Sequence, residues 1–313
     1  AGVKMMLARF YRLSPELETP KYTGKTPVFL VMADRSGDKT GNYHGTTVLT
    51  QTFRGLWGDL YEAMERAGIY KVVPVDINDA EGFAEKIRTY NSGSYKTAGF
   101  LHEIVMMNYG GIRLSREFLQ EAYRLCHESD TPTLVDEIQT CMWYGGMFLF
   151  RKYGLRPDFA VIGKGFPGGE YPASKILTTA EYDNLNQFGA LVTNGQEELA
   201  SLAYLVTMHF ARANADEIDR IGARLENGLQ ALAEKYPSKL VKAEGLGHLA
   251  ALHFGTVAEA ADFTHALHEA CVDASAQLYK ANCVPAVLFK PPVNSDEETV
   301  DRLLEILDGI LSK

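Results

Sequence analysis

The sequence predicts an α/β protein, and three features of the chain lead to this expectation. Short apolar segments with the composition of buried strands alternate with amphipathic helical segments up to Gly195. Two of these strands, Pro132–Asp136 and Phe159–Lys164, are joined by a crossover that can complete a βαβ unit. From Gln196 onward long helices alternate with a few strands, which indicates a smaller α/β domain that follows a larger one.

Each expected element follows from its local pattern. Short apolar runs bounded by turn residues predict further strands at Pro27–Ala33, Tyr70–Val75, Ala98–Val105, Ala173–Thr178, Leu240–Phe254 and Ala286–Lys290. Apolar residues at helical spacing predict helices at Ala1–Leu13, Thr47–Gly68, Asp79–Thr89, Ser115–Glu128, Met147–Tyr153, Gln196–Ala213, Ala215–Lys235, Val257–Lys280 and Asp296–Ser312.

The composition narrows the function classes. The 313-residue chain has a formal net charge of -9 and no basic block, so neither nucleic acid nor an anionic membrane is expected as its main partner. No apolar run approaches the roughly 20 residues that a spanning helix needs. The pair His265 and His268 lacks a third ligand, so no metal site is expected. We expect a cytoplasmic protein with reduced thiols at Cys126, Cys141, Cys271 and Cys283.

An acidic and a basic residue stand at the ends of the two strands of the βαβ unit. Asp136 ends the first strand and Lys164 ends the second. The chirality of such a unit brings both carboxyl ends to one edge of the sheet, so the two side chains are expected to face one crevice. Pyridoxal phosphate (PLP) needs an amine for a Schiff base and a carboxylate that keeps its ring nitrogen protonated. A strand-end Asp or Lys is more often a solvated loop residue, and spacing alone leaves both interpretations open.

Three motifs in order along the chain resemble those of the class III aminotransferases, the ornithine and ω-type branch of the fold-type I PLP enzymes. They are Leu134-Val-Asp-Glu-Ile-Gln-Thr140, Gly154-Leu-Arg-Pro-Asp158 and Ile162-Gly-Lys-Gly-Phe-Pro-Gly-Gly-Glu-Tyr-Pro-Ala-Ser174. The resemblance implies a large PLP-binding domain, residues 1–195, around a mainly parallel seven-stranded-type sheet, and a smaller domain, residues 196–313. It also implies a homodimer that moves an amino group from an amine or amino acid to a keto acid or aldehyde by ping-pong half-reactions.

The resemblance implies roles for three residues of the central unit. Lys164 would carry the Schiff base and, once released, move the proton as a general base. Asp136 would hold the pyridine nitrogen of PLP, whose pKa an ionised carboxylate raises. Gln139 would donate its amide N–H to the ring's 3-oxygen.

Further cofactor contacts are implied elsewhere in the chain. Tyr43 and His44 match the family's aromatic-His-Gly turn, in which the aromatic ring stacks on the cofactor. Thr193 matches a threonine that reaches the phosphate in the neighbouring subunit. The family's phosphate-binding Ser-Gly-x-Glu-Ala turn would lie before Ala1. We therefore expect that this sequence is the larger, C-terminal part of a longer protein, or that residue 1 is the first ordered residue of the chain.

The chain departs from the family where a substrate carboxylate is usually bound. The two arginine positions hold Thr46 and Leu288, and Asn108 replaces a glutamate that pairs with the second arginine. Losing both members of that ion pair leaves no unpaired buried charge. The hypothesis is a substrate whose carboxylate is absent, masked or bound elsewhere, with three candidate cations: Arg54, Arg113 and Lys290.

Two other functions fit the same residues. A PLP-dependent isomerase, either an aminomutase or a racemase, would use the same lysine base. A degenerate, non-catalytic partner subunit is the second alternative, because Gln196 and its neighbours replace the family's turn after Thr193. The retained Asp136, Gln139 and Lys164 argue against that alternative.

Overall fold

The structure is a computed structural model and describes residues 1–12, 14–32, 58–166, 168–169, 171, 173–187, 189–190, 198–277 and 284–313. The chain divides into two compact units. The sheet unit comprises residues 1–104, 114–138 and 150–204. The C-terminal unit comprises residues 105–113, 139–149 and 205–313. The division into domains 1–195 and 196–313 stays a prediction.

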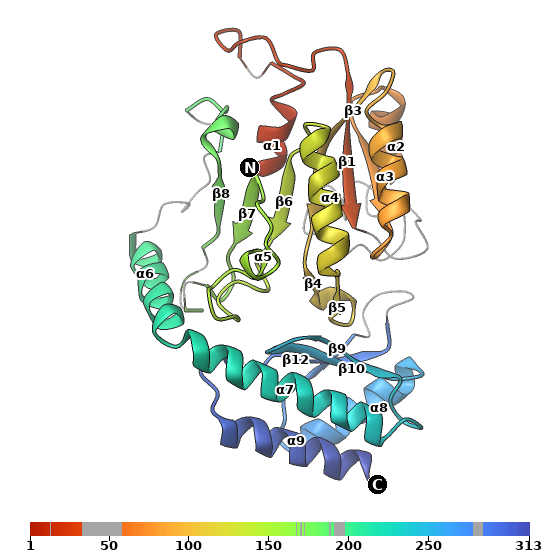
Figure 1. Ribbon diagram of the computed structural model, residues 1–313, viewed down its shortest axis with the longest axis vertical. Coiled ribbons are helices and arrows are strands. Elements are labelled where there is room, and N and C mark those ends of the chain that lie inside the picture. The colour runs from red at the N-terminus through yellow and green to blue at the C-terminus, as the bar shows by residue number, and fades with distance from the viewer. Residues whose placement is uncertain are drawn as a thin grey trace. The chain divides into compact units, whose positions relative to one another are not determined.

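The sheet unit is built on a mainly parallel sheet. Its described strands lie in the order β2-β1-β3-β6-β7-β8. All neighbouring pairs are parallel except β7 with β8, which are antiparallel. Figure 1 shows β6 and β7 side by side. The strands are β1 (Thr26–Met32), β2 (Lys71–Val75), β3 (Tyr95–His102), β6 (Thr133–Asp136), β7 (Phe159–Ile162) and β8 (Lys175–Thr178).

Helices of the sheet unit begin at polar caps and pack through aromatic side chains. Asp79 caps α3 and Ser115 caps α4 by accepting hydrogen bonds from backbone N–H groups of the first turn. Phe83 of α3 is buried between Phe100 of β3 and Phe118 of α4, with ring centroids 4.8 and 6.0 Å apart. The α-helices that lie mainly in this unit are α1 (Gly2–Leu7), α2 (Gly58–Arg66), α3 (Ala80–Thr89), α4 (Arg116–Glu128) and α5 (Leu149–Lys152). The short helix η3 (Ala180–Tyr182) and the first part of α6 (Glu198–Ala213) also belong to it.

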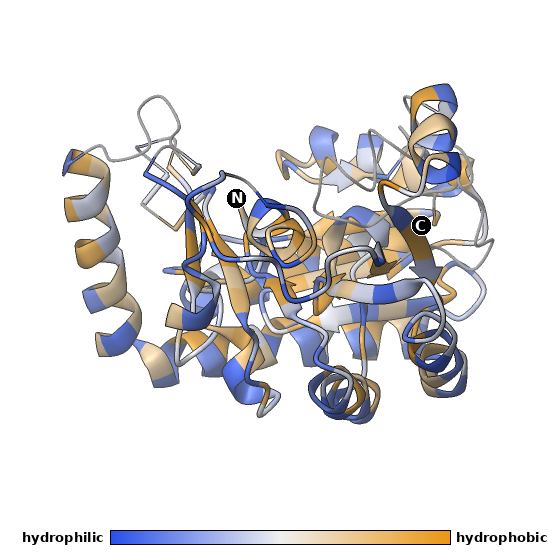
Figure 2. Ribbon diagram, turned by 90° about the horizontal axis from the view of Figure 1, so that it is seen from above, coloured by the Kyte–Doolittle hydropathy of each residue, from blue (hydrophilic) through white to orange (hydrophobic). Residues whose placement is uncertain are grey.

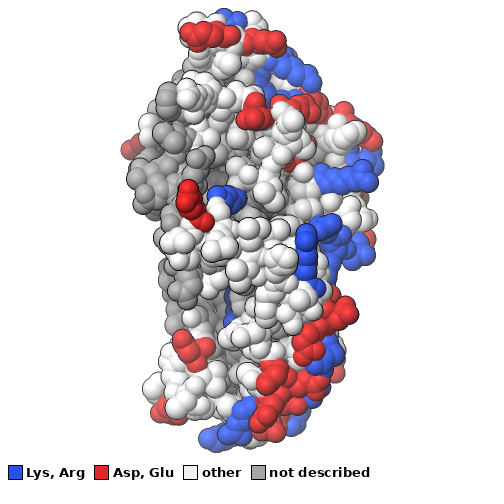
Figure 3. Space-filling model, turned by 90° about the vertical axis from the view of Figure 1, so that its left-hand side faces the viewer, with Lys and Arg blue, Asp and Glu red and all other residues white. Residues whose placement is uncertain are grey.

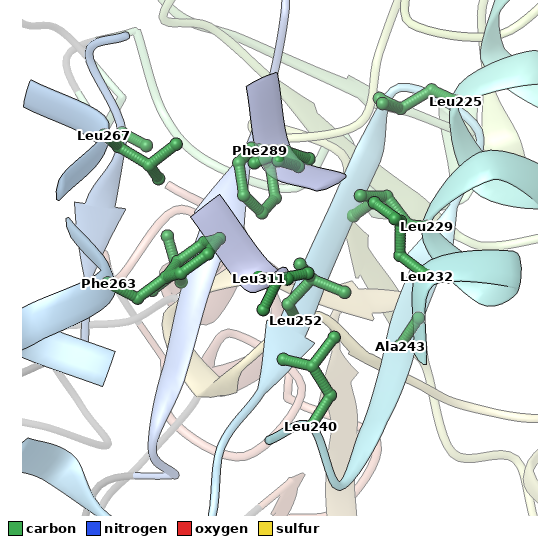
Figure 4. Close-up of a cluster of buried hydrophobic side chains, with 14 of the residues drawn as sticks. Leu225, Leu229, Leu232, Leu240, Ala243, Leu252, Phe263, Leu267, Phe289 and Leu311 are labelled. Carbon is green, nitrogen blue, oxygen red and sulfur yellow. The ribbon is translucent and has the colours of Figure 1, made fainter. Parts of the chain in front are cut away.

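The C-terminal unit packs three helices on an antiparallel sheet of order β11-β12-β10-β9. Helix α7 presents Leu225, Leu229 and Leu232, spaced three and four residues apart, to the core drawn in Figure 4. Phe289 of β12 lies in the same core. The elements are α7 (Ala215–Lys235), β9 (Lys242–Leu246), β10 (Leu249–His253), α8 (Val257–Glu269), β11 (Ser275–Ala276), β12 (Ala286–Phe289) and α9 (Glu297–Leu311).

Two elements predicted for this unit are wrong. Leu240–Phe254 is not one strand, because the chain reverses at Gly247, whose φ of 57° is left-handed, and forms the antiparallel pair β9 and β10. The predicted helix Val257–Lys280 ends at Glu269, and β11 follows. Cys271, with φ of 60°, marks that end.

The hairpin that precedes α4 was also missed. The predicted strand Ala98–Val105 is β3, which begins earlier and ends at His102. A separate pair, β4 (Val105–Met106) and β5 (Ile112–Arg113), then encloses the short helix η2 (Met107–Tyr109). The reversal uses two glycines with left-handed φ of 66° and 69°, Gly110 and Gly111.

Hydropathy follows the layers of the fold. In Figure 2 the strands are mainly hydrophobic, whereas the helices carry hydrophilic residues on one side. Within the described part of the chain, no helix has the length and apolar character needed to cross a bilayer. Nor does any group of three metal-ligating side chains occur among these residues.

Candidate active site

The parallel pairing of β6 and β7 brings Asp136 and Lys164 to one edge of the sheet. Asp136 is the last residue of β6 and lies opposite Val161 of β7. The pairing continues one residue further, because Glu137 N donates to Val161 O over 2.9 Å. Lys164 follows the end of β7 by two residues. The carboxylate and the ammonium therefore emerge from neighbouring strand ends.

Asp136 is a buried carboxylate with little local compensation. Its side chain is 5% exposed, and its Oδ1 accepts a hydrogen bond of 2.8 Å from the backbone N–H of Ile138. Burial raises the pKa of Asp136 from its ordinary 3.8 to about 6. The hydrogen bond from Ile138 and the positive charge of Lys164 lower it, but by less than burial raises it. A cation placed against Asp136 would stabilise its ionised form.

Lys164 has an unusual backbone. Its φ is 50°, in the left-handed region that residues other than glycine rarely adopt. Just before it, a Cβ at Gly163 would come within 3.2 Å of Ile138 Cδ1 and of Ser174 Cβ, so the chain passes tightly between those two residues. Phe166 N donates to Gly163 O over 3.0 Å, which closes the turn. Non-glycine residues held in this region cluster at functional sites.

The glycines after Lys164 form a tight turn. Gly168 and Gly169 have φ values of 73° and 80°. Gly168 N donates to Gly165 O over 3.0 Å. The Lys164 side chain, in contrast to Asp136, is exposed.

Glu137, next to Asp136, has a structural contact that the sequence did not indicate. It is completely buried, and its Oε1 accepts a hydrogen bond of 2.7 Å from the backbone N–H of Phe150. This bond ties the end of β6 to the first turn of α5, and so helps to fix the strand end on which Asp136 stands.

Gln139 belongs to the C-terminal unit and is held there by a lysine. Lys290 Nζ donates to the backbone oxygen of Gln139 over 3.0 Å and to its Oε1 over 3.3 Å. The same ammonium lies 4.6 Å from the ring centroid of Trp143. Sequence reasoning did not pair these residues, because 151 positions separate Gln139 from Lys290.

The other predicted site residues fall into two groups. Tyr43, His44 and Thr193, together with Thr46 and Arg54, lie outside the described residues. The remaining ones lie in the C-terminal unit: Asn108 in η2, Leu288 in β12 and Arg113, whose Nη1 is 3.6 Å from Glu226 Oε1.

Comparison with protein families gives a match over most of the chain. The profile of the family described as Aminotransferase class-III matches residues 39–311. A putrescine aminotransferase from Pectobacterium atrosepticum is 28% identical over 245 residues, 76% of this chain and 52% of the relative. An acetylornithine aminotransferase from Nostoc sp. is 27% identical over 283 residues, 87% of this chain and 63% of the relative. The chain thus spans about half to just under two-thirds of these relatives.

Solved structures of aminotransferases have the same fold. The ornithine aminotransferase of Toxoplasma gondii ME49 matches with a TM-score of 0.74 at 18% identity, over 99% of this chain and 68% of that one. A transaminase from the marine bacterium Virgibacillus matches with a TM-score of 0.74 at 17% identity, over 99% and 71%. These likenesses confirm the predicted fold-type I architecture.

Proposed function

Because the chain belongs to the class III aminotransferase family, we propose that it acts as a PLP-dependent aminotransferase, with Lys164 as its catalytic residue. The observation that carries this proposal is the buried Asp136 carboxylate beside the exposed Lys164 ammonium at the ends of β6 and β7. The curated relatives are named as aminotransferases.

The residues present fit the cofactor. Asp136 is buried, and its raised pKa reflects a need for a positive partner. The protonated ring nitrogen of PLP supplies a cationic N–H donor of that kind. We assign Asp136 to this nitrogen and Gln139 to the ring's 3-oxygen. Tyr43, His44 and Thr193 are proposed as further cofactor contacts on the resemblance of their motifs.

When bound, PLP supplies an aldehyde that takes up an amino group and a ring that withdraws electrons from the neighbouring carbon. Lys164 Nζ would anchor the cofactor covalently and, once displaced by the donor amine, would take the proton from the donor carbon that bears the nitrogen and return it to the cofactor carbon on the other side of that nitrogen. Asp136 would remain ionised throughout and stabilise the positive charge at the ring nitrogen.

The proposed donor is an amine that carries no carboxylate. Arg113 already pairs with Glu226, and Lys290 with Gln139. The third candidate cation, Arg54, lies outside the described residues. Asn108 and Leu288 carry no charge. One relative is named for putrescine, a diamine that has no carboxylate at all. The acceptor would be a keto acid or an aldehyde.

We also propose that two copies of the chain associate. Helix α6 (Glu198–Ala213) carries a stripe of exposed apolar side chains, 54% to 62% exposed at its four most open positions: Leu199, Leu202, Leu205 and Val206. Figure 3 views the side of the molecule on which α6 lies in Figure 1. Apolar stripes of this kind are typical of protein interfaces.

The free thiols Cys126 and Cys141 support placement in the cytoplasm.

An assay of donors and acceptors tests the proposed reaction. The full chain, incubated with PLP, putrescine or another simple amine and 2-oxoglutarate, is expected to form one glutamate per donor consumed. Rapid use of ornithine or γ-aminobutyrate with a low KM would contradict the proposed donor class. Conversion of a single substrate with no acceptor present would indicate an isomerase. No turnover despite covalent PLP at Lys164 would indicate a non-catalytic subunit.

A further inference from the structure

Lys290 makes a set of contacts that the proposed reaction does not use. The residue follows Phe289, which is 3% exposed in the core of the C-terminal unit and pairs with Ala250 in β10. The start of the Lys290 side chain is therefore fixed by the sheet. Its ammonium donates to two oxygens of the same residue, Gln139 O and Gln139 Oε1, over 3.0 and 3.3 Å.

These contacts determine which way the Gln139 amide points. An ammonium has three hydrogen-bond donors and no acceptor, whereas the Gln139 amide has one oxygen and one NH₂ group. Only the oxygen can face Lys290 Nζ. The NH₂ group of Gln139 must then point away from Lys290, and the residue presents a donor instead of an acceptor.

The loop that carries Gln139 is also fixed. Tyr144 OH donates to Leu246 O over 3.0 Å, and the backbone N–H of Gly145 donates to Asp219 Oδ1 over 2.8 Å. Met142 N donates to Met147 O over 2.6 Å, and both methionines are buried with left-handed φ values of 65° and 73°. Such a backbone persists only where its surroundings hold it. The side-chain torsions of Gln139 are thus the remaining freedom, and Lys290 restricts them.

Trp143 also contacts Lys290. Its ring centroid lies 4.6 Å from Lys290 Nζ, so the ring face attracts the ammonium. The Trp143 ring in turn lies near His248, whose imidazole is completely buried, with 6.1 Å between centroids. The ammonium therefore contacts an aromatic face as well as the two Gln139 oxygens.

From this geometry we propose that Lys290 is a positioning residue that orients the Gln139 amide so that its NH₂ group serves the 3-oxygen of PLP. The inference rests on the proposed function, which assigns Gln139 to that oxygen. The oxygen is negatively charged when ionised and accepts hydrogen bonds, so a fixed NH₂ donor suits it and a carbonyl oxygen in its place would repel it. Lys290 acts through Gln139 and need not touch the cofactor.

A double-mutant cycle tests this role with PLP itself as the probe. Lys290→Met removes the charge and keeps the length of the side chain, whereas Lys290→Arg keeps a donor. Lys290→Met is expected to weaken PLP binding, measured by fluorescence quenching, by about tenfold, the effect of losing one charge-assisted hydrogen bond. It should also shift the pH at which the absorbance of the bound cofactor changes. Lys290→Arg should restore part of both properties.

The background variant Gln139→Ala shows whether the effect passes through Gln139. In that background Lys290→Met should change neither affinity nor spectrum further. The matched control is Lys242→Met, a lysine of the same unit that pairs with Glu244, and it should behave as the unaltered protein. An equal loss of PLP affinity with and without Gln139, or no loss in either, would overturn the inference.

A second readout separates this inference from the proposed function. If the unaltered protein binds no PLP, the proposed function fails, yet the orientation of Gln139 can still be measured in the protein alone. The side-chain N–H signals of Gln139 in a ¹⁵N NMR spectrum, identified with Gln139→Ala, should move in Lys290→Met and stay in Lys242→Met. Signals that do not move in Lys290→Met would refute the positioning role whatever the cofactor result.

Discussion

Asp136 and Lys164 stand at the ends of two hydrogen-bonded parallel strands, and the charge of the lysine lowers the pKa of the buried carboxyl. Burial has the larger effect and raises that pKa to about 6. Without a bound cation, the ionised Asp136 carboxylate therefore lowers the stability of the folded protein. A poorly compensated carboxylate at this position fits the proposed contact with a positively charged ring nitrogen.

The first prediction concerns the stability of the cofactor-free protein. Because the folded pKa of Asp136, about 6, exceeds the ordinary value of 3.8, the folded state binds the proton more tightly, and stability falls as the pH rises through that range. Asp136→Asn removes the charge and can keep the hydrogen bond from Ile138. It should raise the free energy of unfolding by on the order of 2 kcal/mol near neutral pH.

Urea denaturation at several pH values checks this sign. The gain from Asp136→Asn should shrink as the pH falls from about 6 toward 3.8, because the carboxyl then becomes protonated in both states. A variant less stable than the unaltered protein near neutral pH would contradict the view that Asp136 is an uncompensated charge.

The second prediction concerns the backbone of Lys164. At its φ of 50° glycine avoids the strain that a Cβ causes, so Lys164→Gly should be more stable than Lys164→Ala by about 1 kcal/mol. Lys175, in strand β8, provides the control. There the glycine variant should be the less stable of the pair, because glycine weakens a strand. An alanine variant more stable than the glycine variant at both positions would show that Lys164 is not strained.

The third prediction concerns the loop that carries Gln139. A Cβ at Gly145 would lie 2.5 Å from Ala215 O, so Gly145→Ala should destabilise the protein by about 1 to 3 kcal/mol and weaken PLP binding with it. A Cβ at Gly309 in α9, in contrast, would meet no atom of the described neighbouring residues within 4 Å. Gly309→Ala should therefore stabilise by about 0.5 to 1 kcal/mol. Thermal unfolding of both variants measures the difference, and a neutral Gly145→Ala would mean that the loop adjusts.

The fourth prediction concerns the apolar stripe on α6. Leu205 is 55% exposed, and burying it against a second copy would make a charge there costly. If the proposed homodimer forms through α6, Leu205→Asp should convert it to monomers in light scattering coupled to gel filtration. Val241→Asp, at a residue 64% exposed in the C-terminal unit, should leave the dimer intact. If Leu205→Asp leaves the mass of the particle unchanged, α6 is not the interface.

The central βαβ unit could be predicted from the sequence because its determinants are local. Two apolar strands, a crossover and the chirality rule bring Asp136 and Lys164 to one edge, and the structure has them there. The reversal between β9 and β10 was missed, because the apolar pattern continues through Gly247 and only its left-handed φ reveals the turn.

Other features depend on tertiary structure. The contact between Gln139 and Lys290 joins residues 151 positions apart, and no local pattern indicates it. The left-handed φ of Lys164 was equally hidden, since lysine has no preference for that conformation. The close packing of Gly163 against Ile138 and Ser174 is a tertiary feature that the local sequence does not reveal.

The most direct test of the account is to find which residue binds the cofactor. The protein is incubated with PLP, reduced with borohydride and digested, and the modified peptide is identified by mass spectrometry. The account predicts a phosphopyridoxyl group on Lys164, absent from Lys164→Ala and reduced in Asp136→Asn. Modification of Lys175 or scattered surface lysines in place of Lys164 would contradict it.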